Sequence, residues 1–586
     1  MHGSLLLIDG ILQNLNEQIE ESTSQASIRS QLKIEFETVV FPQLMTATEL
    51  VRSRNCPPIS IVLLRILKTT QCLTSKAHSL LYSFCQGLCL NVIKNVEYFN
   101  DPCKPYEPLL LKDALHCLTV MTIEKEAGVQ KYYEMEKLLD SRVLLDGLGH
   151  KVSEVREGIL NGCLQCITFD EEIQLTDEKK NYLFLVNNFF SKFEVMSKIL
   201  NAACIEKEPD VMQYFFEFLC RFIRSAPLSS LELESKQLFL EKWDSLYSFI
   251  STSDGALSPT TAAASSVEIL GWIIASLANE STTLKLERII SWQEIVEKAC
   301  SEENPSSLRE AVARSIEASK ILTVLSIYSN SFNQKSSVSD YDHKLSNVAC
   351  RLWLVALTLM QDDDDDIRNI MNKAIAPALE ICNDSEYPKN FLTIGTYSID
   401  MMVNNISECI VYSTLSCTDD IEISNGVQAI LNELFAKSGH VSQLQGTDNE
   451  LDKIFQAEQW NVFIEANVCT NVLSKAIGKA LQLLTLHSKQ DQIRNITKSI
   501  TTRTSEILAT FNVLENKDKG DKWIGGILLQ KDVFGIIYST IFTLQEIMRN
   551  LSVDEMKNID DMKLLSSNKI HPKLDKIIKN ILLYIK

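Results

Sequence analysis

The residues of this chain best suited to chemistry by type and spacing are two cysteine motifs. Cys163 and Cys166 form a C-x-x-C pair, the spacing of thiol redox centres and of half a zinc site. The pair has no second C-x-x-C at zinc-ribbon spacing and lies inside an expected helix, which favours structural cysteines. His116 and Cys117 are adjacent within an apolar run, but a catalytic dyad needs a partner in space. Neither motif predicts an active site.

The second candidate is a run of five aspartates at 362–366, which raises the question of a cation site. Calcium loops space their carboxylates as Asp-x-Asp-x-Asp-Gly, and that spacing is missing here. We interpret the run as a solvated acidic loop that caps the following helix. The sequence also contains no glycine-rich phosphate loop, no H-E-x-x-H and no G-x-S-x-G. We therefore predict no catalytic, cofactor-binding or metal-binding residues, and a protein that is not an enzyme.

The acidic run belongs to a sequence motif that occurs three times in the chain. In each copy a short polar loop is followed by an apolar residue, an arginine and then an expected helix of small and apolar residues. An acidic loop at a helix N-terminus is favoured by the helix macrodipole, and an arginine just inside the helix can reach nearby carboxylates or carbonyls. The motif is typical of the turn inside a HEAT-like helical hairpin. We predict that four residues of these turns are structural ties within a solenoid: Arg156, Arg309, Asp366 and Arg368. The alternative is that they contact a ligand.

Composition indicates the elements that carry these turns. A chain of 586 residues exceeds the ~250–300 residues at which a single core stops growing. Its 19 glycines and 13 prolines fall well below average usage of about 7% and 5%, so helix breakers are scarce. Between 533 and 548, apolar residues recur every three or four positions, as on one helix face. The expected fold is all-α, a HEAT/armadillo-like helical-repeat superhelix.

We expect one continuous, degenerate α-solenoid over residues 1–586. Repeats of roughly 40–47 residues would give about a dozen helical pairs. Clusters of Ser, Asn, Asp, Gly and Thr predict local breaks near 251–261, 329–341, 437–450 and 515–526. The nearly all-apolar segment 351–360 is expected to be a helix buried between neighbouring repeats.

Charge and cysteine usage limit the compartment and the partners. The net charge is −19 and the pI is near 5.1, which argues against nucleic-acid binding through bulk electrostatics. Most of the sixteen cysteines lie within apolar helical runs, as reduced thiols do in intracellular proteins. The N-terminus has no basic region of a signal peptide, and no run approaches the ~18–20 apolar residues of a membrane helix. We expect a cytoplasmic protein with no membrane partner.

One basic strip stands out against this acidic background. It consists of Lys489, Arg494, Lys498 and Arg503, and two of its members, Arg494 and Lys498, are four residues apart and share a face of a continuous helix. The strip is either an ordinary solvated face or a surface that contacts RNA or a protein partner. The last segment, 572–586, is basic and amphipathic, and we interpret it as a capping helix rather than a membrane-surface helix.

Two further segments carry a family resemblance. His2-Gly3 followed by Leu5-Leu6 resembles the His-Gly-x-Leu-Leu segment of the thyroid-adenoma-associated protein family. Residues 454–465 resemble the C-terminal pattern of that family, and the turns at 308–309 and 366–368 fall in a fitting order. The family includes regulatory subunits of tRNA 2′-O-ribose methyltransferases. The resemblance implies that this chain corresponds to the C-terminal portion of a longer protein, with an uncapped first repeat that frays near residues 1–50.

The resemblance implies a non-catalytic scaffold that supports 2′-O-ribose methylation of the tRNA anticodon loop. A partner methyltransferase would carry S-adenosylmethionine, and this chain would bind no cofactor and no small-molecule substrate. Contact with tRNA would run through the partner or through the upstream half. The alternative is a generic HEAT-repeat adaptor for transport or chromatin that binds basic cargo, because its acidic surface suits such cargo.

Overall fold

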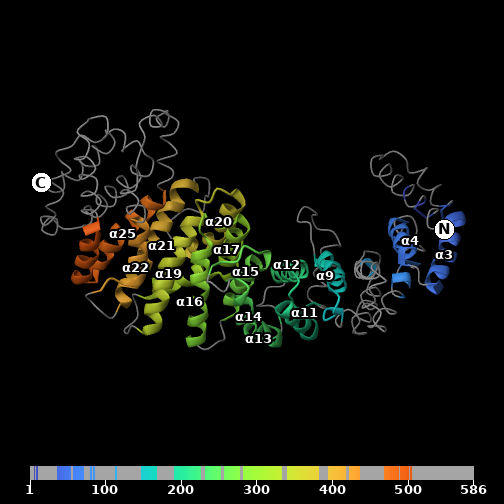
Figure 1. Cartoon of the computed structure of the whole chain (residues 1–586). Helices are drawn as coiled ribbons and strands as arrows, with labels where there is room; N and C mark the ends of the chain where they lie inside the picture. Colours follow the sequence, from blue (N-terminus) through green and yellow to red (C-terminus); the bar gives the residue numbers. More distant parts are fainter. Residues whose placement is uncertain are drawn as a thin grey trace, which may run out of the picture. The chain divides into compact units, whose positions relative to one another are not determined.

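The computed structural model describes the chain chiefly over 36–54, 57–70, 147–167, 190–225, 233–251, 256–277, 282–332, 339–381, 394–417, 422–435, 468–487 and 489–500, with a few isolated positions elsewhere. Within these ranges every regular element is a helix (Figure 1), and the one β-bridge joins Ser251 to Leu257. The all-α expectation is therefore confirmed for the part of the chain that the structure describes.

The chain divides into two compact units, Met1–Ile269 and Leu270–Lys586, and the division falls inside α15 (Thr261–Ser276). In the first unit α9 packs on α12, and α11 packs on both α12 and α13. The elements of this unit before α15 are η1 Phe36–Val40, α3 Phe41–Arg54, α4 Pro57–Thr70, α9 Ser153–Ile167, α11 Phe193–Ile205, α12 Pro209–Ser225, α13 Leu233–Glu241 and α14 Trp243–Ser248.

The amphipathic helix α12 shows why this unit folds as helices. It begins at Pro209, where the fixed proline φ suits the first helical position and the missing N–H costs nothing. Aromatic and apolar side chains then recur at helical spacing on the buried face. Phe218 stacks with Phe222 at 6.2 Å between ring centroids and meets Phe190 edge-on at 5.1 Å. The contact with Phe190 fastens α12 within the core of its unit, whereas the Phe218–Phe222 pair lies within the helix itself.

In the second unit each helix from α16 to α19 packs on the helix three positions further along the chain. The pairs are α16 with α19, α17 with α20, α18 with α21 and α19 with α22, and α21 also packs on α25. The helices are α16 Thr282–Ala299, α17 Ser306–Ser319, α18 Ile321–Phe332, α19 Asp340–Leu359, α20 Asp365–Ile381, α21 Ile394–Ser416, α22 Asn425–Leu434 and α25 Val468–Leu486.

Local sequence explains two helix ends in this unit. Lys320 adopts the left-handed conformation with φ 52°, and this residue separates α17 from α18. Ser339 and Asp342 form a capping box at the start of α19, in which each side chain accepts from the backbone N–H of the other residue. Further along α19, the expected buried segment is confirmed, because Leu352, Trp353 and four of the residues that follow them up to Leu359 are buried.

Two of the predicted breaks fall between described helices. The 251–261 segment lies between α14 and α15, and within 329–341 α18 ends at Phe332 while α19 begins at Asp340. The other two predicted breaks, 437–450 and 515–526, lie outside the described residues, as do 533–548 and 572–586.

Candidate functional site

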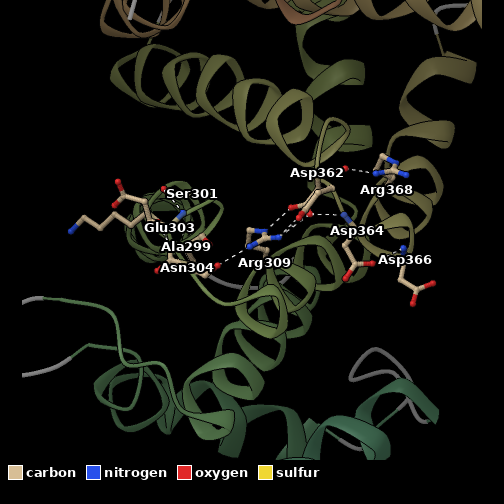
Figure 2. Close-up of polar contacts among 11 residues, drawn as sticks. Ala299, Ser301, Glu303, Asn304, Arg309, Asp362, Asp364, Asp366 and Arg368 are labelled. Atoms are coloured by element: carbon tan, nitrogen blue, oxygen red, sulfur yellow. Dashed lines mark hydrogen bonds and ion pairs between the residues drawn. The ribbon is translucent and has the colours of Figure 1, made fainter. Parts of the chain in front are cut away.

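Arg309, in the first turn of α17, joins two helix-connecting turns. Its Nη1 donates to the Asn304 carbonyl at 2.7 Å, in the turn that precedes its own helix. Its Nε and Nη2 donate to the two oxygens of the Asp362 carboxylate at 2.7 and 3.0 Å, and Nη2 also reaches Asp363 at 2.8 Å. Figure 2 shows the guanidinium between the two turns. One side chain therefore fastens the α16–α17 turn to the α19–α20 turn, which lies 53 residues further along the chain.

The Arg309–Asp362 pair is buried, with each residue 7% exposed. Burial alone would raise the pKa of the Asp362 carboxyl, but hydrogen bonds from Arg309 and from the Asp364 amide outweigh it, so that the pKa lies below its ordinary value. The hydrogen bond to Asp362 raises the pKa of Arg309. Both groups are therefore charged at neutral pH, and removing either one would leave the other charge buried without its main partner.

Arg156 repeats this arrangement in the first unit. Its Nη1 donates to the His150 carbonyl at 2.6 Å, and its Nε and Nη2 donate to the Glu206 carboxylate at 2.6 and 2.8 Å. Burial opposes ionisation of Glu206, but the hydrogen bonds from Arg156 and from the Lys207 and Glu208 amides lower its pKa overall. As with Arg309, one carbonyl comes from the preceding turn and the carboxylate lies far along the chain, here 50 residues further on.

Arg368 and Asp366 lie in the third turn. Arg368 donates to the Asp362 carbonyl and pairs with Asp365 one turn back on its own helix. The Asp366 amide donates to Asp364 Oδ1 at 2.9 Å, which caps the start of α20, while the Asp366 residue itself is exposed. Arg368 thus makes the carbonyl contact typical of the other two turns (Figure 2), and its carboxylate partner is local.

Sequence reasoning missed two ion pairs that join helices distant in the chain, together with the Glu206 partner of Arg156. Arg224 forms a two-bond pair with Glu268 at 2.5 and 2.6 Å, 44 residues along, and Arg351 reaches Glu297 at 2.8 Å across 54 residues. None of these carboxylates lies in a local motif. Because their arginines lie 44 and 54 residues away along the chain, no local sequence signal could have identified them.

The acidic run at 362–366 differs from its predicted form at one position. The expectation was a solvated loop, yet Asp362 is buried because it accepts from Arg309. Asp363 and Asp365 are solvated as expected, with side chains 91% and 84% exposed. Among the described residues, no group of three or more His, Cys, Asp or Glu side chains is arranged to hold a metal ion.

The basic strip divides into two parts. Arg494 and Lys498 lie on one continuous helix at 490–500, and both residues are exposed. Arg494 makes a long, solvated pair with Asp491 at 3.6 Å. Arg503 instead donates to Asn432 at 2.7 Å, and its guanidinium carbon lies 5.8 Å from the Phe435 ring centroid.

These contacts hold Arg503 against α22 and its C-terminal end. Lys489 is half-buried, and its backbone amide donates to the Leu484 carbonyl. Of the four residues of the strip, only Arg494 and Lys498 therefore form an exposed basic pair on one helix.

The C-x-x-C motif lies partly within the described residues. Cys163 is a free, buried thiol, and burial raises its pKa to about 12, which leaves little reactive thiolate at neutral pH. The Cys166 side chain and the His116-Cys117 pair lie outside the described residues. None of the described helices combines the length and the apolarity needed to cross a membrane.

No protein-family model matches this chain, and no curated protein matches it. Of the segments that carry the family resemblance, His2-Gly3 and 454–465 lie outside the described residues. The class that the fold and the site define is a protein, all-helical over the described residues, in which arginines fasten one helix-connecting turn to another 50 to 53 residues further along the chain.

Proposed function

We propose that this chain is a non-catalytic HEAT/armadillo-like solenoid scaffold. The observation that carries the proposal is the repeated arginine tie. Arg156 and Arg309 each bind a carbonyl of their own turn and a carboxylate about 50 residues further on. A contact repeated at a constant offset is expected when similar units stack along the chain.

The packing of the second unit supports the same proposal. Each helix from α16 to α19 packs on the helix three positions further along the chain, a regular pattern that is expected when successive helical repeats stack. Repeat proteins of this kind offer extended surfaces for partners and use them for binding.

The partner we propose is a methyltransferase that 2′-O-methylates the ribose of the tRNA anticodon loop, with this chain as its regulatory subunit. The sequence resemblance supports this partner. The partner would bind S-adenosylmethionine and perform the chemistry, and tRNA would be reached through the partner, because a net charge of −19 disfavours bulk RNA binding. The exposed pair Arg494 and Lys498 is the proposed contact strip on this chain.

A pull-down tests this function. The tagged full chain is expected to recover a ribose 2′-O-methyltransferase together with tRNA. In cells, deletion of this protein is expected to reduce 2′-O-methylation of the tRNA anticodon loop. The double variant Arg494→Glu/Lys498→Glu should lose the methyltransferase or the tRNA. The double variant Lys151→Glu/Lys373→Glu changes the charge equally at two exposed positions elsewhere and should retain both. Recovery of no methyltransferase, with unchanged tRNA methylation on deletion, would refute the proposal.

A second candidate function is an adaptor for basic cargo, and the exposed acidic turn favours it. Three carboxylates face solvent beside the buried ion pair of Asp362 with Arg309: those of Asp363, Asp365 and Asp366. The test is binding of Lys/Arg-rich peptides as a function of salt. Tight binding that weakens with salt and with Asp363→Asn/Asp365→Asn, with no tRNA and no methyltransferase recovered, would favour this adaptor.

A further inference from the structure

Ser339 combines an exposed hydroxyl with a contact to a buried charge. It lies immediately before α19 in extended backbone, with φ −106° and ψ 161°. Its Oγ donates to Asp342 Oδ2 at 2.5 Å and accepts from the Asp342 amide at 3.2 Å. The residue itself is exposed, whereas Asp342 is only 3% exposed. A change at the surface hydroxyl therefore acts directly on an internal carboxylate.

Asp342 is the centre of a junction between three helices. Besides the Ser339 contacts, its Oδ1 accepts from the Tyr328 hydroxyl of α18 at 2.9 Å and lies 3.4 Å from the Tyr412 hydroxyl of α21. Burial, and then the negative charge of Asp342, raise the pKa of Tyr412, so this phenol remains protonated and donates. The carboxylate thus holds α18, the start of α19 and α21 together.

Carboxylates follow the Ser339 hydroxyl at the first and third positions, but only the first, Asp340, is exposed, so it is the carboxylate that a kinase can contact on the folded chain; Asp342 is buried. A protein kinase with a basic substrate groove selects a hydroxyl followed by acidic residues through charge complementarity. Ser346, the next serine of α19, is fully buried and bonded to Ser416, so it offers no accessible hydroxyl. Of these two serines, only Ser339 can meet a kinase.

We propose that Ser339 is a phosphorylation site for an acid-directed serine/threonine protein kinase, and that phosphorylation loosens the junction of α18, α19 and α21. ATP is the donor. The Ser339 Oγ forms a bond to the γ-phosphorus, the bond from that phosphorus to the bridging oxygen breaks, ADP leaves and the hydroxyl proton passes to the kinase base.

The physical effect follows from charge and from the lost donor. Phosphorylation removes the O–H that Asp342 accepts and adds roughly −1.5 to −2 charges beside that buried carboxylate. The phosphate can still accept from the Asp342 amide, but its negative charge lies beside the buried Asp342 carboxylate. Repulsion then pushes Asp342 away from Tyr328 and Tyr412, and the two phenols lose their acceptor.

The test treats the full chain with a purified acid-directed kinase and Mg·ATP. Peptide mass spectrometry is expected to locate a phosphoryl group on Ser339, and the Ser339→Ala variant should lack that peptide modification. Amide hydrogen exchange then measures the junction. Ser339→Ala loses the cap without adding charge and should speed exchange in the first turns of α19 about fivefold.

Phosphorylated protein should exchange there roughly tenfold faster than Ser339→Ala, with α21 around Tyr412 affected as well. Phosphate found only on other residues, or a Ser339 phosphate that leaves exchange in α19 and α21 unchanged, would overturn the proposal. Tyr412→Phe separates the two steps, because it should leave phosphorylation of Ser339 intact while removing one of the contacts that the phosphate disrupts.

Discussion

Arg309 can join two turns because its guanidinium is planar and carries five donors in a fixed fork. Two of those donors meet both oxygens of Asp362 side by side, and a third reaches the Asn304 carbonyl. Lysine offers a single ammonium and cannot reproduce this geometry. The arginine at the turn is therefore required for its shape as well as its charge.

Replacement of Arg309 by alanine is expected to destabilise the α17–α20 contact by about 3 kcal/mol, because Asp362 would stay buried without its charged partner. Native-state hydrogen exchange of the α17 and α20 amides measures the loss as a lower free energy of local opening. Arg494→Ala serves as the control. Its side chain is 77% exposed, and its change should stay within about 0.5 kcal/mol. An equal effect of the two substitutions would contradict the role of the tie.

Buried cysteines provide a second prediction at this scale. Burial raises the pKa of Cys163 and of Cys300 to about 12, so neither thiol forms appreciable thiolate near pH 8. Iodoacetamide should leave both unmodified in the native protein and label both after unfolding in guanidinium. Cys417, which is only partly buried, is the internal comparison and should react first. Fast native labelling of Cys163 would revive a redox reading of the C-x-x-C motif.

Among helices, the close approach of α15 to α17 depends on one glycine. A Cβ on Gly271 would lie 2.3 Å from the Ser315 carbonyl oxygen and 2.4 Å from Ser315 Oγ. That hydroxyl also accepts from Trp292 Nε1 at 2.9 Å, so α16 is fastened at the same point. The absence of a side chain at 271 allows three helices to share one serine.

Gly271→Ala is therefore expected to destabilise the second unit, although alanine is the better helix former. The overlap with backbone atoms of Ser315 should cost about 3 kcal/mol, which exceeds the roughly 1 kcal/mol gain in helix propensity. Thermal unfolding followed by circular dichroism measures the change. Ala275→Ser, at an exposed position of the same helix, is the control and should shift the midpoint little. A stabilised Gly271→Ala variant would show that the helices can separate without penalty.

Across the whole molecule, acid should weaken the turn ties in both units. Asp362 and Glu206 have folded-state pKa values below their ordinary values, so their contribution to stability is fully present at neutral pH. That contribution is lost as the pH falls below the ordinary carboxyl values of about 4 and through the lower folded-state values. Amide exchange of α9, α12, α17 and α20 between pH 7 and pH 3 measures the loss.

The variant Asp362→Asn isolates the local effect from the general charge of the chain. At pH 7 the amides of α17 and α20 should be less protected from exchange in this variant than in the unaltered protein, and they should lose less protection on acidification. The amides of α9 and α12 should respond to acid as in the unaltered protein. An identical acid response of α17 and α20 in the two proteins would show that Asp362 is not the titrating group. A general response to the net charge of −19 would change both units together.

The sequence alone determined the helical class of the described residues and the three turns that precede Arg156, Arg309 and Arg368. Scarce glycine and proline and the three-to-four spacing of apolar residues are local properties, so they identify helices without knowledge of the packing. The turn arginines Arg156, Arg309 and Arg368 were likewise identified from their local sequence motif, and all three make contacts within or between turns.

Only the tertiary structure decided which partner each arginine binds. Glu206 and Asp362 lie 50 and 53 residues from their arginines, and no local rule distinguishes buried Asp362 from its solvated neighbour Asp363. The same holds for Arg503, which Asn432 and Phe435 hold against α22 while Arg494 faces solvent. Stacking of helices distant in sequence sets burial and pairing, because both depend on neighbours through space rather than along the chain.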